Sequence, residues 1–329
     1  MEKGQKTTGK GKGKWKTIVF ILLGLFLLAG GFGIYKAMDT KPVTNPPVNG
    51  NEPIDQPKEE PANGAVNVLL LGSDIRKDGE LGHTDAIILA HLDLRQKKYK
   101  LMSIPRDTRV YLDGVGNTKL TSAHYMVQSQ KGVQGGITEI IKQVQGLTGL
   151  GVDYYAETTY WRFEEMIDAL GGITMTLPFA VTFTHAWYPQ NLNKTISRGT
   201  HFLDGEMVTE VVHERYSLPG NDFGRQRLHG EALIGLANAL EDPKNVAKLP
   251  KLIDTFSRLF IATNVTKEDM LKIAAATKGF EPSQVQYFQL PGNGVNGIYD
   301  DALKENNWQY VVDKDKTKQI VEEHFMPEE

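Results

Sequence analysis

The sequence predicts an α/β domain that follows one membrane-spanning segment. The first observation is an uncharged apolar run at residues 17–34, which is long enough to cross a thin bilayer core. The second is a series of short apolar runs of strand length, beginning at residues 67–72. The third is a set of longer amphipathic stretches, such as residues 161–170, which ends at a glycine pair typical of a helix C-terminus. Strands and helices mixed along one chain in this way are typical of an α/β domain.

Six lysines precede the apolar run, and Trp15 and Tyr35 flank it. Aromatic flanks fit the headgroup layer, and the positive-inside rule keeps the basic end in the cytoplasm. We therefore predict a cytoplasmic tail at residues 1–16 and a single transmembrane helix at residues 17–36 in the cell membrane, with the main domain extracytoplasmic. A cleaved signal peptide is the alternative, because Ala29 and the two glycines after it supply small residues for a cleavage site.

A proline-rich tether follows the predicted span. Residues 37–64 hold six prolines among polar residues, a composition typical of an extended spacer, so we place the extracytoplasmic domain at residues 65–329. The whole chain carries −3 and residues 1–16 carry +5, so the remainder carries −8. An acidic outer domain argues against a nucleic-acid partner. The absence of cysteine excludes thiol catalysis and cysteine-based zinc sites.

Within the domain, polar turns that carry charged residues follow two of the predicted strands. Asp74 and Arg76 follow the first strand, and Arg106 and Asp107 follow the third. Functional groups at strand ends are the usual arrangement in α/β proteins. The predicted strands are residues 67–72, 86–94, 99–104 and 173–177, the predicted helices are residues 135–144, 161–170, 205–216, 222–240 and 268–276, and a surface strand and terminal helix are expected within residues 296–329.

Two stretches place arginine beside a carboxylate. Arg106 is followed by Asp107, and Asp222 precedes Arg225 and Arg227. A planar guanidinium holds phosphate oxygens with paired hydrogen bonds, and a nearby carboxylate can hold a divalent metal or take a proton. The two stretches together predict a site for a phosphorylated substrate. Two surface salt-bridge clusters are the alternative, with Asp222 acting as a helix cap.

The chain resembles the LytR-CpsA-Psr family over roughly residues 65–300. The segments that match in order and spacing are residues 67–76, 82–85, 103–108, 119–123, 168–172, 203–215, 222–225 and 296–299. The resemblance implies a central mixed sheet flanked by helices, with an apolar pocket for a polyprenyl chain. It also implies a membrane-anchored phosphotransferase. Such an enzyme moves a glycopolymer of the teichoic acid or capsule class from a polyprenyl pyrophosphate carrier to peptidoglycan.

The resemblance also implies roles for individual residues. Arg106 and Arg225 match arginines that hold the pyrophosphate, and Asp74 and Asp85 match carboxylates near a magnesium (or manganese) ion and the pyrophosphate. The catalytic set is Asp74, Asp85 and Arg106, and the substrate-binding set is Arg76, Lys119, Arg215, Arg225, Arg227, His83, His213 and His229. Phosphoryl transfer needs charge neutralisation and in-line positioning more than covalent help, and one aspartate could take the proton of the attacking sugar hydroxyl.

Simpler roles stay open for several of these residues. Asp74 is also placed to make an Asx hydrogen bond in a turn. Asp107 is equally suited to cap a turn or to anchor Arg106. Lys119 is either close to phosphate or solvated.

Three positions depart from the family pattern. His83 and His213 stand where the family usually has arginine, and His229 stands where it usually has glutamine; Arg227 is a shifted substitute for an arginine usually found one position later. Three explanations stay open. In the first, the site is retuned for another substrate or leaving group. In the second, the protein is a catalytically degenerate polymer-binding or regulatory protein of the attenuator type. In the third, the histidines converge on a transition metal. If the imidazoles replace arginines they must be protonated, which predicts that substrate affinity rises as pH falls from about 8 to about 6.

Overall fold

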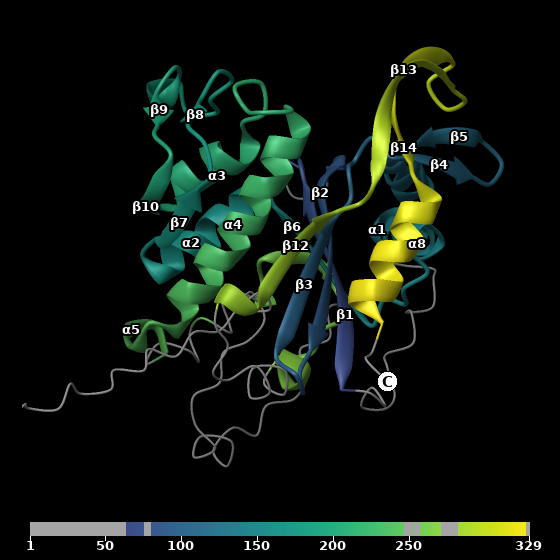
Figure 1. Ribbon diagram of the computed structural model, residues 1–329. Coiled ribbons are helices and arrows are strands. Elements are labelled where there is room, and N and C mark those ends of the chain that lie inside the picture. The colour runs from purple at the N-terminus through teal and green to yellow at the C-terminus, as the bar shows by residue number, and fades with distance from the viewer. Residues whose placement is uncertain (1–63, 76–79, 247–251, 253–256, 271–281, 327–329) are drawn as a thin grey trace, which may run out of the picture.

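The protein has a central mixed sheet flanked by helices, as the sequence predicts (Figure 1). This computed structural model describes residues 64–75, 80–246, 252, 257–270 and 282–326. The predicted tail and transmembrane helix, and the tether up to residue 63, lie outside these residues. No helix in the described ranges is long and apolar enough to cross a membrane.

Six strands form the central sheet in the spatial order β11-β6-β1-β2-β3-β12. β1 pairs antiparallel with β2 and parallel with β6, and β3 pairs antiparallel with β2 and parallel with β12. The strands are β1 (Ala65–Ser73), β2 (Thr84–Asp93), β3 (Lys98–Ser103), β6 (Tyr154–Thr159), β11 (Phe260–Thr263) and β12 (Val285–Gln289). Three of the predicted strands correspond to β1, β2 and β3, with ends that differ by one or two residues.

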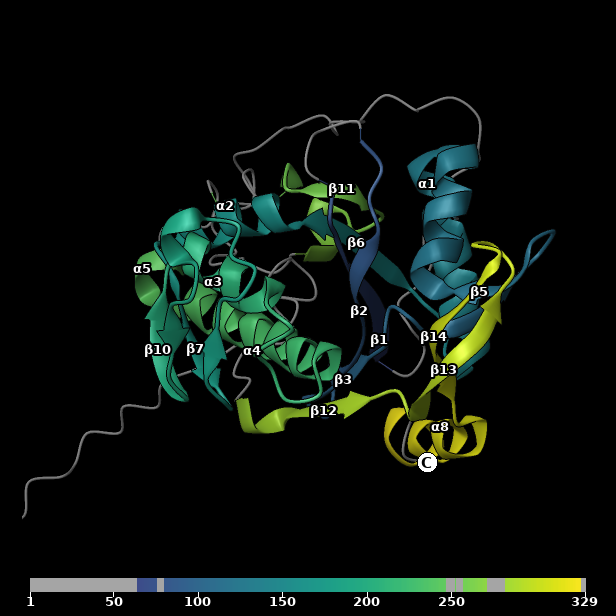
Figure 2. The same cartoon turned by 90° about the horizontal axis from the view of Figure 1, so that it is seen from above.

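Helices cover both faces of this sheet (Figure 2). One apolar core joins a sheet face to α2, α3 and α4, and the second joins the opposite face to α1 and the C-terminal helical segment. The helices are α1 (Leu120–Thr148), α2 (Tyr160–Leu170), α3 (Gly205–His213), α4 (Asp222–Glu241), α5 (Pro243–Val246) and α8 (Lys314–Ile320), followed by the π-helical η4 (Val321–Phe325). The predicted helix at residues 135–144 is the second half of α1, after the break at Gly132 (φ 74°).

Helix ends follow the capping chemistry of the sequence in two cases. Gly171 ends α2 in the left-handed conformation (φ 82°), which glycine adopts without steric cost. Asp204 caps α3 by accepting the N–H of Met207. The prediction that α3 continues to residue 216 is wrong. The helix ends at His213, because the backbone is extended at Glu214.

The predicted cap of α4 is also wrong in its chemistry. Asn221 occupies the cap position but makes no side-chain cap hydrogen bond. The carboxylate of Asp222 binds the side chains of Arg225 and Gln226 instead. The predicted helix at residues 268–276 lies mostly outside the described residues, because residues 271–281 are among those not described.

Small hairpins and two-stranded sheets complete the described part of the fold. Tyr310 of the last hairpin donates its backbone N–H to the carbonyl of Asp107, so this hairpin braces the turn after β3. The pairs are β4 (Arg109–Leu112) with β5 (Gly116–Lys119), β7 (Ile173–Leu177) with β10 (Gly199–Leu203), β8 (Val181–Thr182) with β9 (Thr195–Ile196), and β13 (Gly292–Asp300) with β14 (Glu305–Val312). The predicted strand at residues 173–177 is β7, and β13, β14 and α8 fill the C-terminal region where a strand and a helix are expected.

Candidate active site

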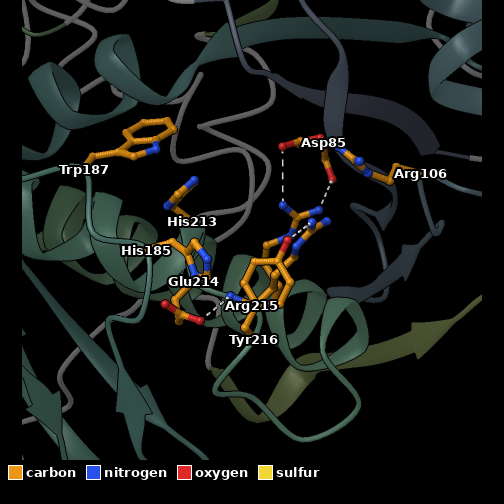
Figure 3. Close-up of a pocket in the computed structure, with 9 residues that line it drawn as sticks. Asp85, Arg106, His185, Trp187, His213, Glu214, Arg215 and Tyr216 are labelled. Carbon is orange, nitrogen blue, oxygen red and sulfur yellow. Dashed lines mark hydrogen bonds and ion pairs between the residues drawn. The ribbon is translucent and has the colours of Figure 1, made fainter. Parts of the chain in front are cut away.

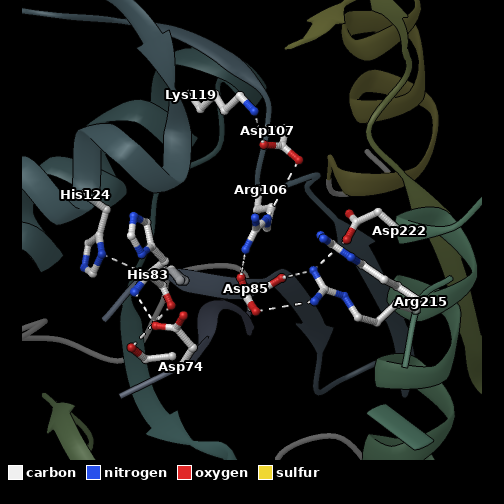
Figure 4. Close-up of polar contacts among 12 residues, drawn as sticks. Asp74, His83, Asp85, Arg106, Asp107, Lys119, His124, Arg215 and Asp222 are labelled. Atoms are coloured by element: carbon white, nitrogen blue, oxygen red, sulfur yellow. Dashed lines mark hydrogen bonds and ion pairs between the residues drawn. The ribbon is translucent and has the colours of Figure 1, made fainter. Parts of the chain in front are cut away.

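Two arginines from distant parts of the chain converge on Asp85 at the start of β2. Figure 4 shows Asp85 beside one of them, Arg106. Arg106, in the turn after β3, contacts one carboxylate oxygen of Asp85 through Nη1. Arg225, in the first turn of α4, places Nη1 3.4 Å from the other oxygen. The fold therefore brings together a carboxylate and two guanidiniums, although Arg106 is 21 residues and Arg225 is 140 residues from Asp85 in sequence.

Charge pairing decides the ionisation of this group. Burial alone would raise the pKa of Asp85, but the Arg225 and Arg106 guanidiniums outweigh burial and hold that pKa below its usual range. Arg225 is itself buried, with 2% of its surface exposed, and also binds Asp222 at 2.6 Å. Asp85 is therefore ionised at neutral pH and orders two cations in one place.

Asp107 and Lys119 support the same turn. Lys119 lies at the end of β5 and places Nζ 2.8 Å from one oxygen of Asp107. The other oxygen of Asp107 lies 3.8 Å from Nε of Arg106. Of the two simple roles considered for Asp107, the structure favours anchoring Arg106, and it places Lys119 in the same charged group.

The Asp85 group forms one wall of a cavity of about 330 Å³ (Figure 3). The lining residues are Asp85, Arg106, His185, Trp187, His213, Glu214, Arg215, Tyr216 and Arg225. Arg215 lies with its guanidinium 4.5 Å from the ring centre of Tyr216. The cavity thus combines a charged wall with a wall of aromatic rings.

A second, apolar pocket lies between the sheet and helices α2 and α4. It is lined by Leu70, Leu71, Gly72, Ala86, Ile88, Ala156, Thr158, Thr159, Tyr160, Phe163, Val212, His229, Ala232, Leu233 and Phe260, and its present volume is about 80 Å³. Tyr160 belongs to this pocket and packs edge-on against Trp187, which lines the charged cavity. The two pockets are therefore neighbours that share a partition.

These features are those expected from the family resemblance, and residues 34–325 match the model of the LytR_cpsA_psr family. The chain belongs to the LytR_cpsA_psr family. Its relatives carry two kinds of name. It is 28% identical to the polyisoprenyl-teichoic acid–peptidoglycan teichoic acid transferase TagU of Bacillus licheniformis, over 88% of this chain and 91% of that protein. It is 25% identical to the regulatory protein MsrR of Staphylococcus aureus, over 81% of this chain and 76% of that protein.

Solved structures share the LytR_cpsA_psr fold. The crystal structure of Bacillus subtilis TagV matches with a TM-score of 0.64 and 24% identity, over 80% of this chain and 99% of that one. A structure of TagT bound to LIIa-WTA matches with a TM-score of 0.62 and 22% identity, over 83% of this chain and 95% of that one. At these identities the comparison establishes the common fold.

The three histidines singled out through the family resemblance lie in different surroundings. His213 lines the charged cavity, its ring centre 4.1 Å from that of Trp187. His229 lines the apolar pocket, with Nε2 3.0 Å from the carbonyl of Val212. His83 is exposed and stacks on Tyr125. The described residues contain no group of three or more His, Cys, Asp or Glu side chains placed to hold a metal ion, so convergence of these histidines on a metal is wrong.

Burial also changes the charge expected for two of them. It lowers the pKa of His213 to about 4, and the Arg225 guanidinium lowers it further in the same direction. The same two causes lower the pKa of His229 to about 4. Both imidazoles are therefore neutral between pH 6 and 8 in the free protein. This corrects the expectation that these two imidazoles act there in protonated form as phosphate-binding groups.

Other predicted site residues of this LytR_cpsA_psr protein are placed as follows. Arg227 binds Glu231 at 2.6 Å and lies over the ring of Tyr287, outside the residues that line the charged cavity. Asp74 accepts the backbone N–H of His83 at 2.5 Å, so it joins the two ends of the connection between β1 and β2. Arg76 lies outside the described residues.

Gly82 makes the loop contact of Asp74 possible. A Cβ atom at this position would lie 2.6 Å from an Asp74 carboxylate oxygen and 2.6 Å from the backbone nitrogen of Ile75. Both distances are well below van der Waals contact, so any larger residue must displace the Asp74 loop. The glycine in the matched segment 82–85 therefore has a packing role beside the site.

Sequence reasoning missed the aromatic wall of the cavity. His185 and Trp187 follow β8, and Tyr216 follows α3, so no local motif joins them. The signal that was available is the density of rings in residues 183–188, a loop that holds four aromatic or imidazole side chains. Aromatic rings gathered in a loop beside arginines point to a ligand that has both charge and an apolar face.

Proposed function

We propose that this protein is a membrane-anchored phosphotransferase that moves a glycopolymer of the teichoic acid or capsule class from a polyprenyl pyrophosphate carrier to peptidoglycan. The observation that carries the proposal is the convergence of Arg106 and Arg225 on Asp85, at a cavity that adjoins an apolar pocket. The transferase name of TagU supports the reaction class. The predicted single span would place the site outside the cell membrane, where no nucleic-acid partner is expected for an acidic domain.

Each of the two pockets suits a different part of the donor substrate. The pyrophosphate binds to Arg106 and Arg225, because their charge-assisted hydrogen bonds offset its negative charge. The polyprenyl chain enters the apolar pocket lined by residues such as Ile88 and Leu233, where hydrocarbon burial is worth roughly 0.8 kcal/mol per methylene. Because the pocket now holds about 80 Å³, the lipid must displace side chains as it enters.

The transfer step balances without a redox partner. A hydroxyl oxygen of a peptidoglycan sugar forms a bond to the phosphorus that carries the glycopolymer, and the bond from that phosphorus to the bridging oxygen breaks. The products are a phosphodiester and polyprenyl phosphate, and one proton leaves the hydroxyl. Asp85 is a weak base, because the pKa of its carboxyl is depressed and both oxygens face arginines, so the proton passes to solvent.

The carboxylates of Asp74 and Asp85 are suitable ligands for a magnesium or manganese ion. Such ions need only one or two protein carboxylates when substrate phosphates and water complete the shell. Asp74 and Asp85 would hold the ion, and Asp85 is ionised as ligation requires. When bound, the ion supplies charge neutralisation for the pyrophosphate.

The testing experiment supplies the full chain with a short-chain polyprenyl pyrophosphoryl sugar, a peptidoglycan fragment and Mg²⁺. Mass spectrometry of the fragment should reveal a new sugar phosphodiester, and polyprenyl phosphate should form in equal amount. Arg225→Ala should abolish both, whereas Arg227→Ala, outside the cavity, is the matched control. Full product formation by the Arg225→Ala variant would contradict the assignment.

A polymer-binding or regulatory protein is the second candidate function. It is favoured by the neutral state of His213 at a position where the family resemblance implies arginine, and by the name of MsrR. The same experiment separates the two functions. Binding of the donor without formation of either product would support the binding protein and reject the enzyme.

A further inference from the structure

Gln226 is a buried amide whose hydrogen bonds join α4 to the central sheet. It lies near the start of α4, directly after Arg225, and 2% of its surface is exposed. Its Oε1 accepts the hydroxyl of Ser103 at 2.9 Å and an amide N–H of Gln289 at 3.1 Å. Its Nε2 donates to Asp222 at 2.8 Å. The amide therefore links α4 to the paired ends of β3 and β12, which lie side by side in the sheet (Figure 2).

Each end of this link leads to one of the two arginines of the site. Ser103 ends β3, and Arg106 follows in the next turn. On the other side, the Asp222 carboxylate binds Gln226 through one oxygen and Nη2 of Arg225 through the other. A shift of the Gln226 side chain would therefore move the segment that carries one guanidinium relative to the other guanidinium.

Arg225 depends on this link more than on Asp85. Its Nη2 lies 2.6 Å from Asp222, whereas its Nη1 lies 3.4 Å from Asp85. A hydrogen bond to one carboxylate oxygen fixes the rotation of the whole group, so Gln226 decides the direction in which Asp222 presents its other oxygen. Without the amide, a partly buried carboxylate oxygen loses its partner and the carboxylate is free to turn. Gln226 therefore controls the guanidinium of Arg225 through Asp222.

The separation of the two guanidiniums matters for the choice of ligand. Two guanidiniums at a fixed separation can each bind one phosphoryl group of a pyrophosphate, whereas a monophosphate has a single phosphoryl group to offer to both. Charge-assisted hydrogen bonds are lost when donor and acceptor are misplaced, so the advantage of the pyrophosphate depends on how rigidly the pair is held. The same separation distinguishes the pyrophosphate donor from the polyprenyl phosphate product.

We propose that Gln226 is a positioning residue that fixes the separation between the guanidiniums of Arg106 and Arg225, and through it the preference of the site for a pyrophosphate over a monophosphate. The proposal rests on the proposed function and adds the selectivity between donor and product. Gln226 does not line the charged cavity, so it acts through Ser103 and Asp222 and makes no contact with the substrate. A positioning role changes the ratio of the two affinities, whereas a purely structural role lowers both affinities together.

The test compares farnesyl pyrophosphate with farnesyl phosphate on the full chain in detergent, by isothermal titration calorimetry with Mg²⁺. The parent should bind the pyrophosphate about thirtyfold more tightly, in the range of one further hydrogen-bonded contact between charged groups. Gln226→Met removes the amide and keeps the size of the side chain. It should lower that ratio by about fivefold or more, while the affinity for farnesyl phosphate stays within about twofold of the parent.

A paired exchange supplies the second arm. Gln226→Glu alone places a carboxylate against Asp222 and should remove most of the preference. The double variant Gln226→Glu with Asp222→Asn has the same net charge as the parent. Its introduced amide donates to the introduced carboxylate and still offers an oxygen to Arg225. The double variant should therefore recover most of the preference that Gln226→Glu loses.

Gln143→Met is the matched control. Gln143 is also an amide that binds a backbone carbonyl and a carboxylate, but it lies on α1, on the opposite side of the sheet from α4. Its replacement should change neither affinity. Urea unfolding checks that each variant is folded. If Gln226→Met does not fold, Ser103→Ala removes only the β3 contact of the amide and should lower the ratio in the same direction.

The outcomes separate the positioning role from the wider function. A parent that prefers the pyrophosphate, together with a folded Gln226→Met variant of unchanged ratio, overturns the positioning role and leaves the proposed function intact. An equal loss for both ligands in Gln226→Met also overturns it, because Gln226 then supports only the fold. A parent that binds neither ligand, or that binds both equally, rejects the pyrophosphate site of the proposed function and the positioning role together.

Discussion

Glu157 should make the stability of this protein fall as pH rises from about 4.5 to about 7. This residue lies in β6 opposite Leu71 of β1, and none of its surface is exposed. Neither carboxylate oxygen makes a hydrogen bond of acceptable geometry within the described structure. Burial raises the pKa of Glu157 to about 7, and the nearby Ser73 hydroxyl offsets only part of that rise.

The direction and size of this stability change follow from the titration of Glu157 in the unfolded and the folded protein. Below pH 4.5 the carboxyl of Glu157 is protonated in both states and has no effect. Between pH 4.5 and 7 the unfolded chain loses this proton while the folded protein keeps it, so the free energy of unfolding decreases. Above pH 7 the loss is complete and reaches about 3 kcal/mol, because each pKa unit is worth ~1.4 kcal/mol.

Glu157→Gln removes the ionisation and keeps the shape of the side chain. Equilibrium urea unfolding, followed by tryptophan fluorescence at pH 5 and pH 8, gives the free energies of parent and variant. The variant should gain up to about 3 kcal/mol relative to the parent at pH 8, and at most a small part of that at pH 5. Glu165→Gln, at an exposed position of α2, is the control. Parallel stability profiles for parent and Glu157→Gln would refute a buried carboxyl with a raised pKa.

Four further predictions concern the site. Arg106→Ala and Arg225→Ala should each weaken pyrophosphate binding by about 2 kcal/mol, and Arg→Lys should rescue only part of it, as titration calorimetry can test; unchanged binding in both alanine variants would reject the site. Asp85→Asn should lower transfer activity, and it should also lower the urea midpoint because it removes the charge that pairs with the buried Arg225; a full rate would remove Asp85 from the reaction. The purified chain should carry or take up a polyprenyl phosphate, which lipid extraction and mass spectrometry would reveal; no lipid, with or without added carrier, would count against the apolar pocket. The ratio of pyrophosphate affinities between the parent and His213→Gln should stay constant from pH 6 to pH 8, since the pKa of His213 is about 4; a ratio that rises as pH falls would show that phosphate binding recharges this imidazole.

Much of the sheet could be predicted because its strands are short apolar runs bounded by polar turns. β1, β2 and β3 were found to within two residues for this reason. The first half of α1 was missed, because Gly132 interrupts the helix and the residues before it include few large apolar side chains. β6 was also missed, because half of its six residues are glutamate or threonine. β11 and β12 were missed too, since edge strands pair on one side only and need no continuous apolar run.

Within the site, residue chemistry selected the two arginines, and the family resemblance selected the carboxylate. Arg106 and Arg225 were chosen because guanidiniums beside carboxylates suit phosphate, and the structure brings both of them to Asp85. Arg227 shows the limit of that reasoning. One position along a helix turns a side chain by about 100°, and the structure pairs Arg227 with Glu231 instead.

The histidines could not be assigned from sequence, because the charge of an imidazole depends on burial that only tertiary structure sets. At an exposed position the group titrates near pH ~6.5, which made a protonated substitute for arginine a reasonable expectation. In the folded protein His213 lies between Trp187 and the field of Arg225, and both burial and that cation disfavour a second positive charge. Arginine at the same position would remain charged and would add to the charged wall of the cavity. With histidine at position 213, the cations that line the charged cavity are Arg106, Arg215 and Arg225, and the imidazole adds a neutral ring beside Trp187.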